Sequence, residues 1–141
     1  MPVKATVPDD IDRRLDTLGD ALAADCPEIE FAYLFGSAST GDRTPRSDID
    51  LAIYVSESAD ACAARLETGR IVGRHLGTDA VDVVLLNFAP TALAGRILTS
   101  RRVIVDRRPF TRHRFESRVA RQFQDFRIRE HRLLAERFPR G

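Results

Sequence analysis

Residues 31–41 read Phe-Ala-Tyr-Leu-Phe-Gly-Ser-Ala-Ser-Thr-Gly, and residues 47–55 read Ser-Asp-Ile-Asp-Leu-Ala-Ile-Tyr-Val. Each stretch contains an apolar run of the length expected for a buried strand. The second run carries Asp48 and Asp50, and side chains two apart on a strand point to the same face. Two like charges side by side are unfavourable unless a positive group lies between them. The pattern therefore predicts a divalent metal site on one face of this strand.

Three further residues fit a site that handles phosphate. Gly36 permits a turn and a close approach of the backbone to a ligand. Ser37 lies where a helix should begin, so its hydroxyl and the nearby backbone N–H groups can receive phosphate oxygens. Asp82 is the charged residue of the run Val-Asp-Val-Val-Leu-Leu at 81–86. An unpaired carboxylate on a buried strand costs several kcal/mol, and a shared metal would give Asp82 a partner.

Each of these features has a simpler explanation when it is taken alone. A Gly-Ser pair is usually a turn, an Asp-x-Asp pair is usually a solvated strand face, and Asp82 could be a strand-end cap or an ion-pair partner. Their combination, with this spacing and with apolar strands around them, favours a catalytic site. Arg46 and Ser47 lie in the loop before the metal strand, where they could touch a triphosphate or simply be solvated.

The length and composition indicate one globular domain. The chain has 141 residues, of which 43% are hydrophobic and 30% are charged, and such a chain buries roughly 68% of its unfolded surface. The N-terminal residues lack the apolar stretch of a signal peptide, and no run approaches the ~20 apolar residues needed to span a bilayer. Cys26 and Cys62 have no metal-ligand spacing, so we expect them to be reduced and buried, consistent with a cytoplasmic location.

The charge is distributed unevenly along the chain. Residues 1–100 carry 9 basic and 16 acidic side chains, whereas residues 101–141 carry 13 arginines and 5 acids. The arginine-rich end could bind RNA or DNA through phosphates, dock on a partner protein, or present a solvated helix face. Because arginine is enriched at protein interfaces, we favour partner docking over direct nucleic-acid binding.

The order of elements indicates an α/β (α+β) fold, with a small mixed β-sheet flanked by helices and a long C-terminal helix. The connection between the first two strands is too short for a parallel crossover, which predicts an antiparallel pair. We expect one domain over residues 1–108, with the helix of residues 109–141 packed on it through an apolar stripe. The expected helices span residues 9–25, 60–76, 90–99 and 109 onward, and the expected strands span residues 31–35, 48–55, 81–86 and 102–105.

The motif of Gly36 and Ser37, followed after ten residues by Asp48-Ile-Asp50, resembles that of the nucleotidyltransferase superfamily typified by DNA polymerase β. More narrowly, it is similar to the minimal nucleotidyltransferases of bacteria and archaea, which are commonly antitoxins paired with HEPN ribonuclease toxins. The resemblance is most specific over residues 31–55. It implies a polymerase-β-like nucleotidyltransferase fold.

The resemblance also implies roles for individual residues. It assigns Gly36 and Ser37 to triphosphate binding, and Asp48 and Asp50 to two Mg²⁺ ions. It assigns Asp82 to one of those ions and to the acceptor hydroxyl. The implied reaction transfers AMP from ATP to a tyrosine hydroxyl of the partner HEPN toxin. Two alternatives remain open at this point, namely an antitoxin that acts mainly by binding and occlusion, and a transferase that modifies a small molecule such as an antibiotic.

Overall fold

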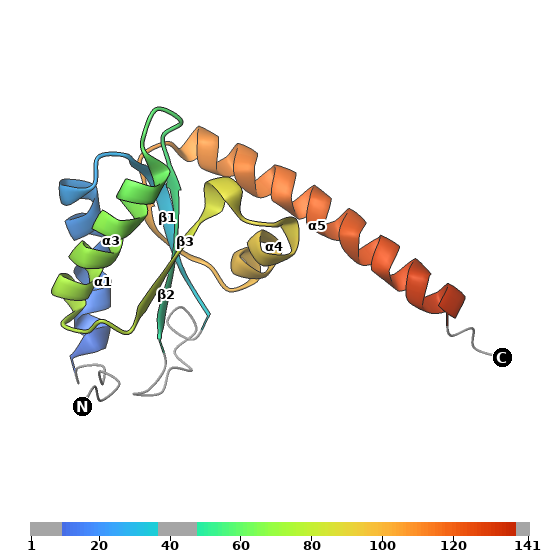
Figure 1. Ribbon diagram of the computed structural model, residues 1–141, viewed down its shortest axis with the longest axis horizontal. Helices are drawn as coiled ribbons and strands as arrows, with labels where there is room; N and C mark the ends of the chain where they lie inside the picture. Colours follow the sequence, from blue (N-terminus) through green and yellow to red (C-terminus); the bar gives the residue numbers. More distant parts are fainter. Residues whose placement is uncertain (1–9, 37–47, 138–141) are drawn as a thin grey trace.

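A computed structural model describes residues 10–36 and 48–137 of the chain. Over these residues the helices and strands follow the expected order and are drawn in Figure 1. The elements are α1 (Ile11–Asp25), β1 (Ile29–Phe35), β2 (Ile49–Val55), α3 (Ala61–Leu76), β3 (Val81–Leu85), the 3₁₀ turn η1 (Leu86–Phe88), α4 (Thr91–Thr99), β4 (Arg102–Asp106) and α5 (Pro109–Arg137). The helix expected to begin at Ser37 and the loop expected over 41–47 lie outside the described residues.

The four strands form one mixed sheet in the order β3-β2-β1-β4. β1 pairs antiparallel with both β2 and β4, whereas β2 and β3 are parallel. The antiparallel pairing of the first two strands confirms the sequence prediction. Predicted element ends differ by one or two residues, because β1 begins at Ile29 and β3 gives way to η1 after Leu85.

Helices cover both faces of the sheet (Figure 1). One core lies beneath α1 and α3, where Leu18, Ile49 and Leu51 are fully buried. The other lies beneath α4 and α5, where Phe31 stacks on Tyr54 with ring centroids 4.7 Å apart. Central strands that are buried on both faces read as continuous apolar runs, which explains why both β1 and β2 lack a clear polar alternation.

The ends of α3 follow the usual chemistry of helix caps. The Asp60 carboxylate accepts the backbone N–H of Ala63 at 3.1 Å, which satisfies a donor left free at the helix N-terminus. At the other end, Gly77 adopts a φ of 71° in the left-handed region, where glycine pays no steric penalty. These caps explain why the helix expected over residues 60–76 ends where the sequence predicts.

α5 packs on the sheet over its first half. Phe115 and Val119 are 5% and 4% exposed, and a Cβ on Gly95 of α4 would lie only 2.3 Å from the Phe123 ring. Further along, α5 extends past α4 (Figure 1), and Leu133 and Leu134 are 62% and 51% exposed. The apolar stripe is therefore used at its start and left uncovered near its end. The division of the chain at residues 108 and 109 stays a prediction.

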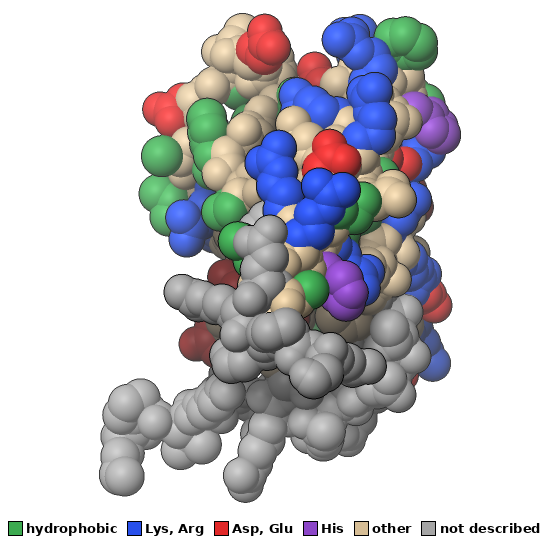
Figure 2. Space-filling model, turned by 90° about the vertical axis from the view of Figure 1, so that its right-hand side faces the viewer, with side chains coloured by type: hydrophobic (Ala, Val, Ile, Leu, Met, Phe, Trp, Pro, Cys, Tyr) green, Lys and Arg blue, Asp and Glu red, His purple; other side chains and the backbone are tan. Residues whose placement is uncertain are grey.

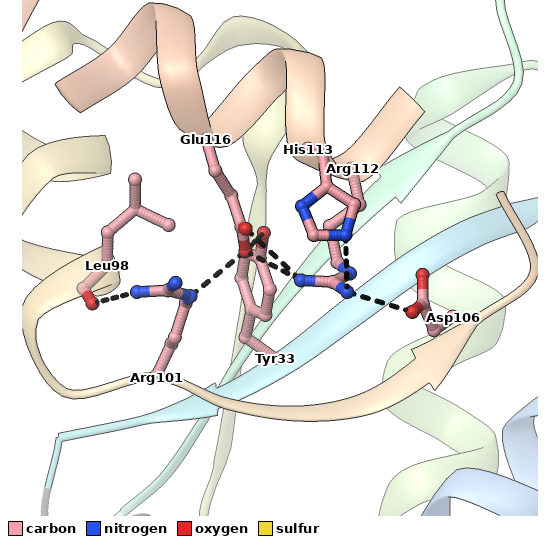
Figure 3. Close-up of polar contacts among 7 residues, drawn as sticks. All are labelled: Tyr33, Leu98, Arg101, Asp106, Arg112, His113 and Glu116. Carbon is pink, nitrogen blue, oxygen red and sulfur yellow. Dashed lines mark hydrogen bonds and ion pairs between the residues drawn. The ribbon is translucent and has the colours of Figure 1, made fainter. Parts of the chain in front are cut away.

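A network of hydrogen bonds and ion pairs connects the N-terminal part of α5 to the strands (Figure 3). The buried Tyr33 hydroxyl of β1 donates to Glu116 Oε2 at 2.7 Å, and Arg101 Nε donates to the same oxygen at 2.9 Å. Arg112 donates to Glu116 Oε1 at 3.1 Å and to Asp106 Oδ2 at 3.0 Å. The network therefore ties α5 to β1, to β4 and to the junction between α4 and β4.

The cysteine prediction is half right. Cys26 is buried at 3% exposure, and both cysteines are free, but Cys62 is exposed because it lies on the solvent-facing side of α3. In the part of the chain that the structure describes, no helix combines the length and the apolar character needed to cross a membrane.

Candidate active site

The register of β2 and β3 brings two of the predicted acids together. The strands are parallel, and Asp50 and Asp82 are direct partners across the ladder. Because residues in register on adjacent strands point to the same face, these two side chains lie beside each other. Ile49 and Leu51 point the other way into the core beneath α1 and α3. Asp48 lies one residue before β2 and is exposed.

The electrostatics of Asp50 reflect this crowding. Burial raises the pKa of Asp50 first, and the negative charges of Asp82 and Asp48 raise it further. The like charges disfavour ionisation of the half-buried carboxyl. A bound cation would relieve the same repulsion, so the energetics of this cluster favour a positive ligand.

The donor atoms suit a hard divalent cation. Carboxylate oxygens are the ligands that Mg²⁺ prefers, and Mg²⁺ usually keeps several waters and binds one or two protein carboxylates together with substrate phosphates. Within residues 10–36 and 48–137, no three His, Cys, Asp or Glu side chains form a ready-made metal cage. The acids therefore fit Mg²⁺ by chemistry and register, and waters and substrate would have to supply its remaining ligands.

Gly36 lies directly against this cluster. Its φ is +66°, and a Cβ at this position would lie 2.9 Å from Asp50 Oδ2. The preceding residue, Phe35, pairs with Asp50 across β1 and β2. A residue with a side chain would therefore meet both backbone strain and the Asp50 carboxylate. The structure thus requires glycine where the sequence motif has it.

One residue of the site has no signal in the sequence. The backbone N–H of Gly36 donates to Ser100 Oγ at 3.0 Å, although the two residues are 64 positions apart. A lone serine after a predicted helix gives no reason to be singled out. Only the antiparallel pairing of β1 with β4 places it here. The other predicted nucleotide-binding residues, Ser37, Arg46 and Ser47, lie outside the described residues.

A cavity of about 830 Å³ lies at the opposite end of the sheet from the acids, lined by Glu30, Tyr54 and Ser56 together with residues of α5. β1 begins and β2 ends there, whereas Gly36 and Asp50 lie where β1 ends and β2 begins. Its walls carry both glutamates and arginines. The acid cluster is therefore not part of this cavity.

This sheet, with paired strand carboxylates beside a glycine turn, defines a nucleotidyltransferase. The model of the family "Polymerase beta, Nucleotidyltransferase" matches residues 20–110, and the chain belongs to that family. The predicted polymerase-β-like fold is thereby confirmed.

Among individual relatives, the chain is similar to the protein adenylyltransferase MntA of Shewanella oneidensis. The two are 37% identical over 73 residues, a match that covers 52% of this chain and 51% of MntA. The match thus spans about half the length of this curated relative.

Solved structures extend the likeness to most of the chain. A toxin–antitoxin crystal structure with AMP-PNP matches with a TM-score of 0.67 at 25% identity, covering 89% of this chain and 96% of the other. A complex of the tri-AMPylated Shewanella oneidensis HEPN toxin with its MNT antitoxin matches with a TM-score of 0.61 at 23% identity, covering 89% and 93%. At 23% identity the second match shows the fold alone.

Proposed function

We propose that this protein is the antitoxin of a HEPN/MNT toxin–antitoxin system. It transfers AMP from ATP to a tyrosine hydroxyl of the partner HEPN toxin, in the cytoplasm. The observation that carries the proposal is the placement of Asp50 beside Asp82, with Gly36 against the Asp50 carboxylate. The similarity to MntA, a protein adenylyltransferase, points to the same reaction. The toxin–antitoxin structure with AMP-PNP supports ATP as the nucleotide.

In this reaction the protein acts mainly by orienting ATP and the acceptor hydroxyl. The tyrosine oxygen forms a bond to the α-phosphorus of ATP, the bond from that phosphorus to the bridging oxygen breaks, and pyrophosphate leaves. Gly36 and Ser37 form the turn at which the triphosphate binds, with Arg46 and Ser47 as additional contacts. Asp82 is the residue assigned to the acceptor hydroxyl, and its carboxylate would receive the proton. Holding the two reactants in line supplies much of the rate acceleration.

Asp48, Asp50 and Asp82 are the residues that would hold Mg²⁺, in a site for two ions. When bound, the ions supply charge stabilisation for the phosphate oxygens and lower the pKa of the acceptor hydroxyl. The raised pKa of Asp50 supports this assignment, because its causes include the two neighbouring carboxylates that a cation would neutralise.

The C-terminal half of α5 is exposed, and in this proposal it forms the surface that binds the toxin. Basic side chains occupy much of the described surface on the side of the molecule that Figure 2 shows. Arg127, Arg129 and Arg132 are exposed, and none of them forms an ion pair with another described residue. Uncovered leucines at 133 and 134 add apolar area to the same segment. A mixture of arginine and apolar side chains is typical of a protein interface.

This uncovered helix also favours a second candidate function, in which the antitoxin acts by occlusion and the transferase site is accessory. The double variant Asp48→Ala with Asp50→Ala separates the two. If catalysis is required, the double variant binds the toxin but no longer protects cells that express it at equal abundance. Full protection by the double variant would establish occlusion as sufficient.

The direct test incubates the purified protein with α-labelled ATP, Mg²⁺ and its HEPN partner. Label on a toxin tyrosine, lost in Asp50→Asn and retained in the control variant Asp20→Asn at an exposed position of α1, is the expected result. A toxin that stays unlabelled in Mg²⁺ and in Mn²⁺ would contradict the proposal. A parallel reaction with aminoglycosides as acceptors tests the small-molecule alternative.

A further inference from the structure

The turn at Gly36 has supports on two sides. On the β2 side, the Asp50 carboxylate lies so close that a Cβ on Gly36 would be 2.9 Å from it. On the β4 side, the Gly36 N–H donates to Ser100 Oγ at 3.0 Å. The turn thus lies between a metal-site acid and a serine from a distant part of the chain.

The sheet explains how Ser100 reaches this position. Leu34 and Arg102 are partners in the antiparallel ladder of β1 and β4. Continuing that register by two residues places Gly36 opposite Ser100. At this point the strand ladder has ended, and a side-chain hydroxyl takes the N–H that a backbone carbonyl would otherwise accept. Such a donor, when partly buried, is costly to leave unpaired.

Ser100 is itself held firmly. It ends α4, and its backbone N–H donates to Ile97 O at 3.3 Å. The next residue, Arg101, donates to Leu98 O at 2.7 Å and to Glu116 Oε2 at 2.9 Å. The junction between α4 and β4 is therefore fastened to both α4 and α5. Because this junction is held in place, the Ser100 hydroxyl is a fixed hydrogen-bond acceptor for the Gly36 N–H.

The same hydrogen bond limits what Gly36 can do. A backbone N–H that already donates to a serine hydroxyl is not directed at a phosphate oxygen. Gly36 therefore serves the site through its turn, and the shape of that turn depends on Ser100. A phosphate-binding turn works best when it is held in its bound conformation before the ligand arrives.

We propose that Ser100 is a positioning residue of the nucleotide site, which fixes the Gly36 turn beside Asp50 through the bond from the Gly36 N–H to its Oγ. The inference rests on the proposed function for the identity of the ligand, a nucleoside triphosphate. It predicts that loss of the Ser100 hydroxyl weakens nucleotide binding more than it slows transfer. The fold itself is little affected, because Ser100 contributes no side chain to either core.

The test compares three variants of the full chain. Ser100→Ala removes the hydroxyl, and Ser100→Thr keeps it at the same position, where the backbone φ is −125° and therefore not left-handed. Thr99→Ala is the matched control, because the neighbouring Thr99 hydroxyl donates to Arg96 O at 2.6 Å at the same helix end. A purely structural role for hydroxyls at this junction would give Ser100→Ala and Thr99→Ala the same phenotype.

Two kinds of readout decide the outcome, the first being nucleotide binding and turnover and the second amide hydrogen exchange. Calorimetric titration with AMP-PNP and Mg²⁺ should show a dissociation constant raised roughly 2- to 12-fold in Ser100→Ala, the range that corresponds to one neutral hydrogen bond. In transfer assays the KM for ATP should rise by a similar factor, with kcat changed less. Both constants should return toward the wild-type values in Ser100→Thr and stay there in Thr99→Ala.

The second readout needs no nucleotide. Hydrogen exchange measured by NMR should show the Gly36 amide exchanging several-fold faster in Ser100→Ala than in the wild type or in Thr99→Ala. Unchanged exchange of this amide would overturn the proposed positioning role of Ser100, whatever the transfer activity of the variants. A wild-type protein that binds no AMP-PNP would instead overturn the proposed function, while the amide exchange still decides whether Ser100 holds Gly36.

Discussion

The Tyr33 hydroxyl donates to Glu116 Oε2 at 2.7 Å, which joins the middle of β1 to the root of α5 across 83 residues of sequence. Burial and the neighbouring Glu116 raise the pKa of Tyr33, so its hydroxyl remains a donor at every physiological pH. Glu116 also pairs with Arg101 and Arg112. This one carboxylate therefore holds together three groups, of which Tyr33 and Arg112 have little access to water and Arg101 is 36% exposed.

Removing that carboxylate should destabilise the protein strongly. The side chain of Arg112 is only 14% exposed, and Glu116→Ala removes one of the two carboxylates that pair with its guanidinium. Loss of one partner of a buried pair costs about 3 kcal/mol or more. Tyr33→Phe should cost only about 1–2 kcal/mol, because it removes one hydrogen bond. Urea denaturation measures both, and equal costs for the two variants would contradict the central role of Glu116.

Gly36→Ala should abolish AMP transfer. The alanine is strained by a φ of +66°, and its Cβ meets Asp50 Oδ2 at 2.9 Å. The left-handed conformation alone costs about 1–2 kcal/mol. Gly77→Ala is a matched control, because Gly77 has a φ of 71° at the end of α3. We expect both variants to lose stability in thermal unfolding, Gly36→Ala somewhat more because of the added contact with Asp50, and only Gly36→Ala to lose transfer activity.

Asp50→Asn should stabilise the metal-free protein at neutral pH. The folded-state pKa of Asp50 is raised above its ordinary value of 3.8. The folded protein therefore keeps this proton to a higher pH than the unfolded chain, and stability falls as the pH rises through that window. Asparagine removes this penalty, so the Tm should rise by about 2–5 °C at pH 7. The difference should vanish near pH 3, where both states are protonated.

Mg²⁺ should reverse that order. A cation bound only by the folded state raises its stability, so MgCl₂ should increase the Tm of the wild type and of the control Asp20→Asn. Asp50→Asn should respond weakly. Equal shifts in all three proteins would mean that the ion binds elsewhere or that its effect is one of ionic strength.

The exposed end of α5 should be dispensable for folding. Leu133→Asp with Leu134→Asp should change the free energy of unfolding by less than about 0.5 kcal/mol, because these side chains are 62% and 51% exposed. Phe115→Ala, by contrast, should cost about 3–5 kcal/mol, because Phe115 is 5% exposed. The leucine double variant should bind the HEPN toxin more weakly in calorimetry. Undiminished toxin binding would place the interface elsewhere.

Local sequence pattern determined the elements and the chemistry of this protein. The apolar runs around Gly36 and Asp50 predicted two adjacent antiparallel strands, and the spacing of the acids predicted a shared face. The helix expected over residues 60–76 corresponds to α3, which Asp60 caps at its start and Gly77 caps at its end. These features follow from near neighbours in the chain, because strand alternation and helix capping involve residues only a few positions apart.

Only the tertiary structure decided which distant residues meet. The parallel register of β2 and β3 sets Asp82 opposite Asp50, and the pairing of β1 with β4 sets Ser100 against Gly36. The stripe of α5 predicted packing along the whole helix, but the sheet and α4 are too short to cover Leu133. Strand register and helix coverage depend on the packing of the whole domain, a property that no local window of sequence contains.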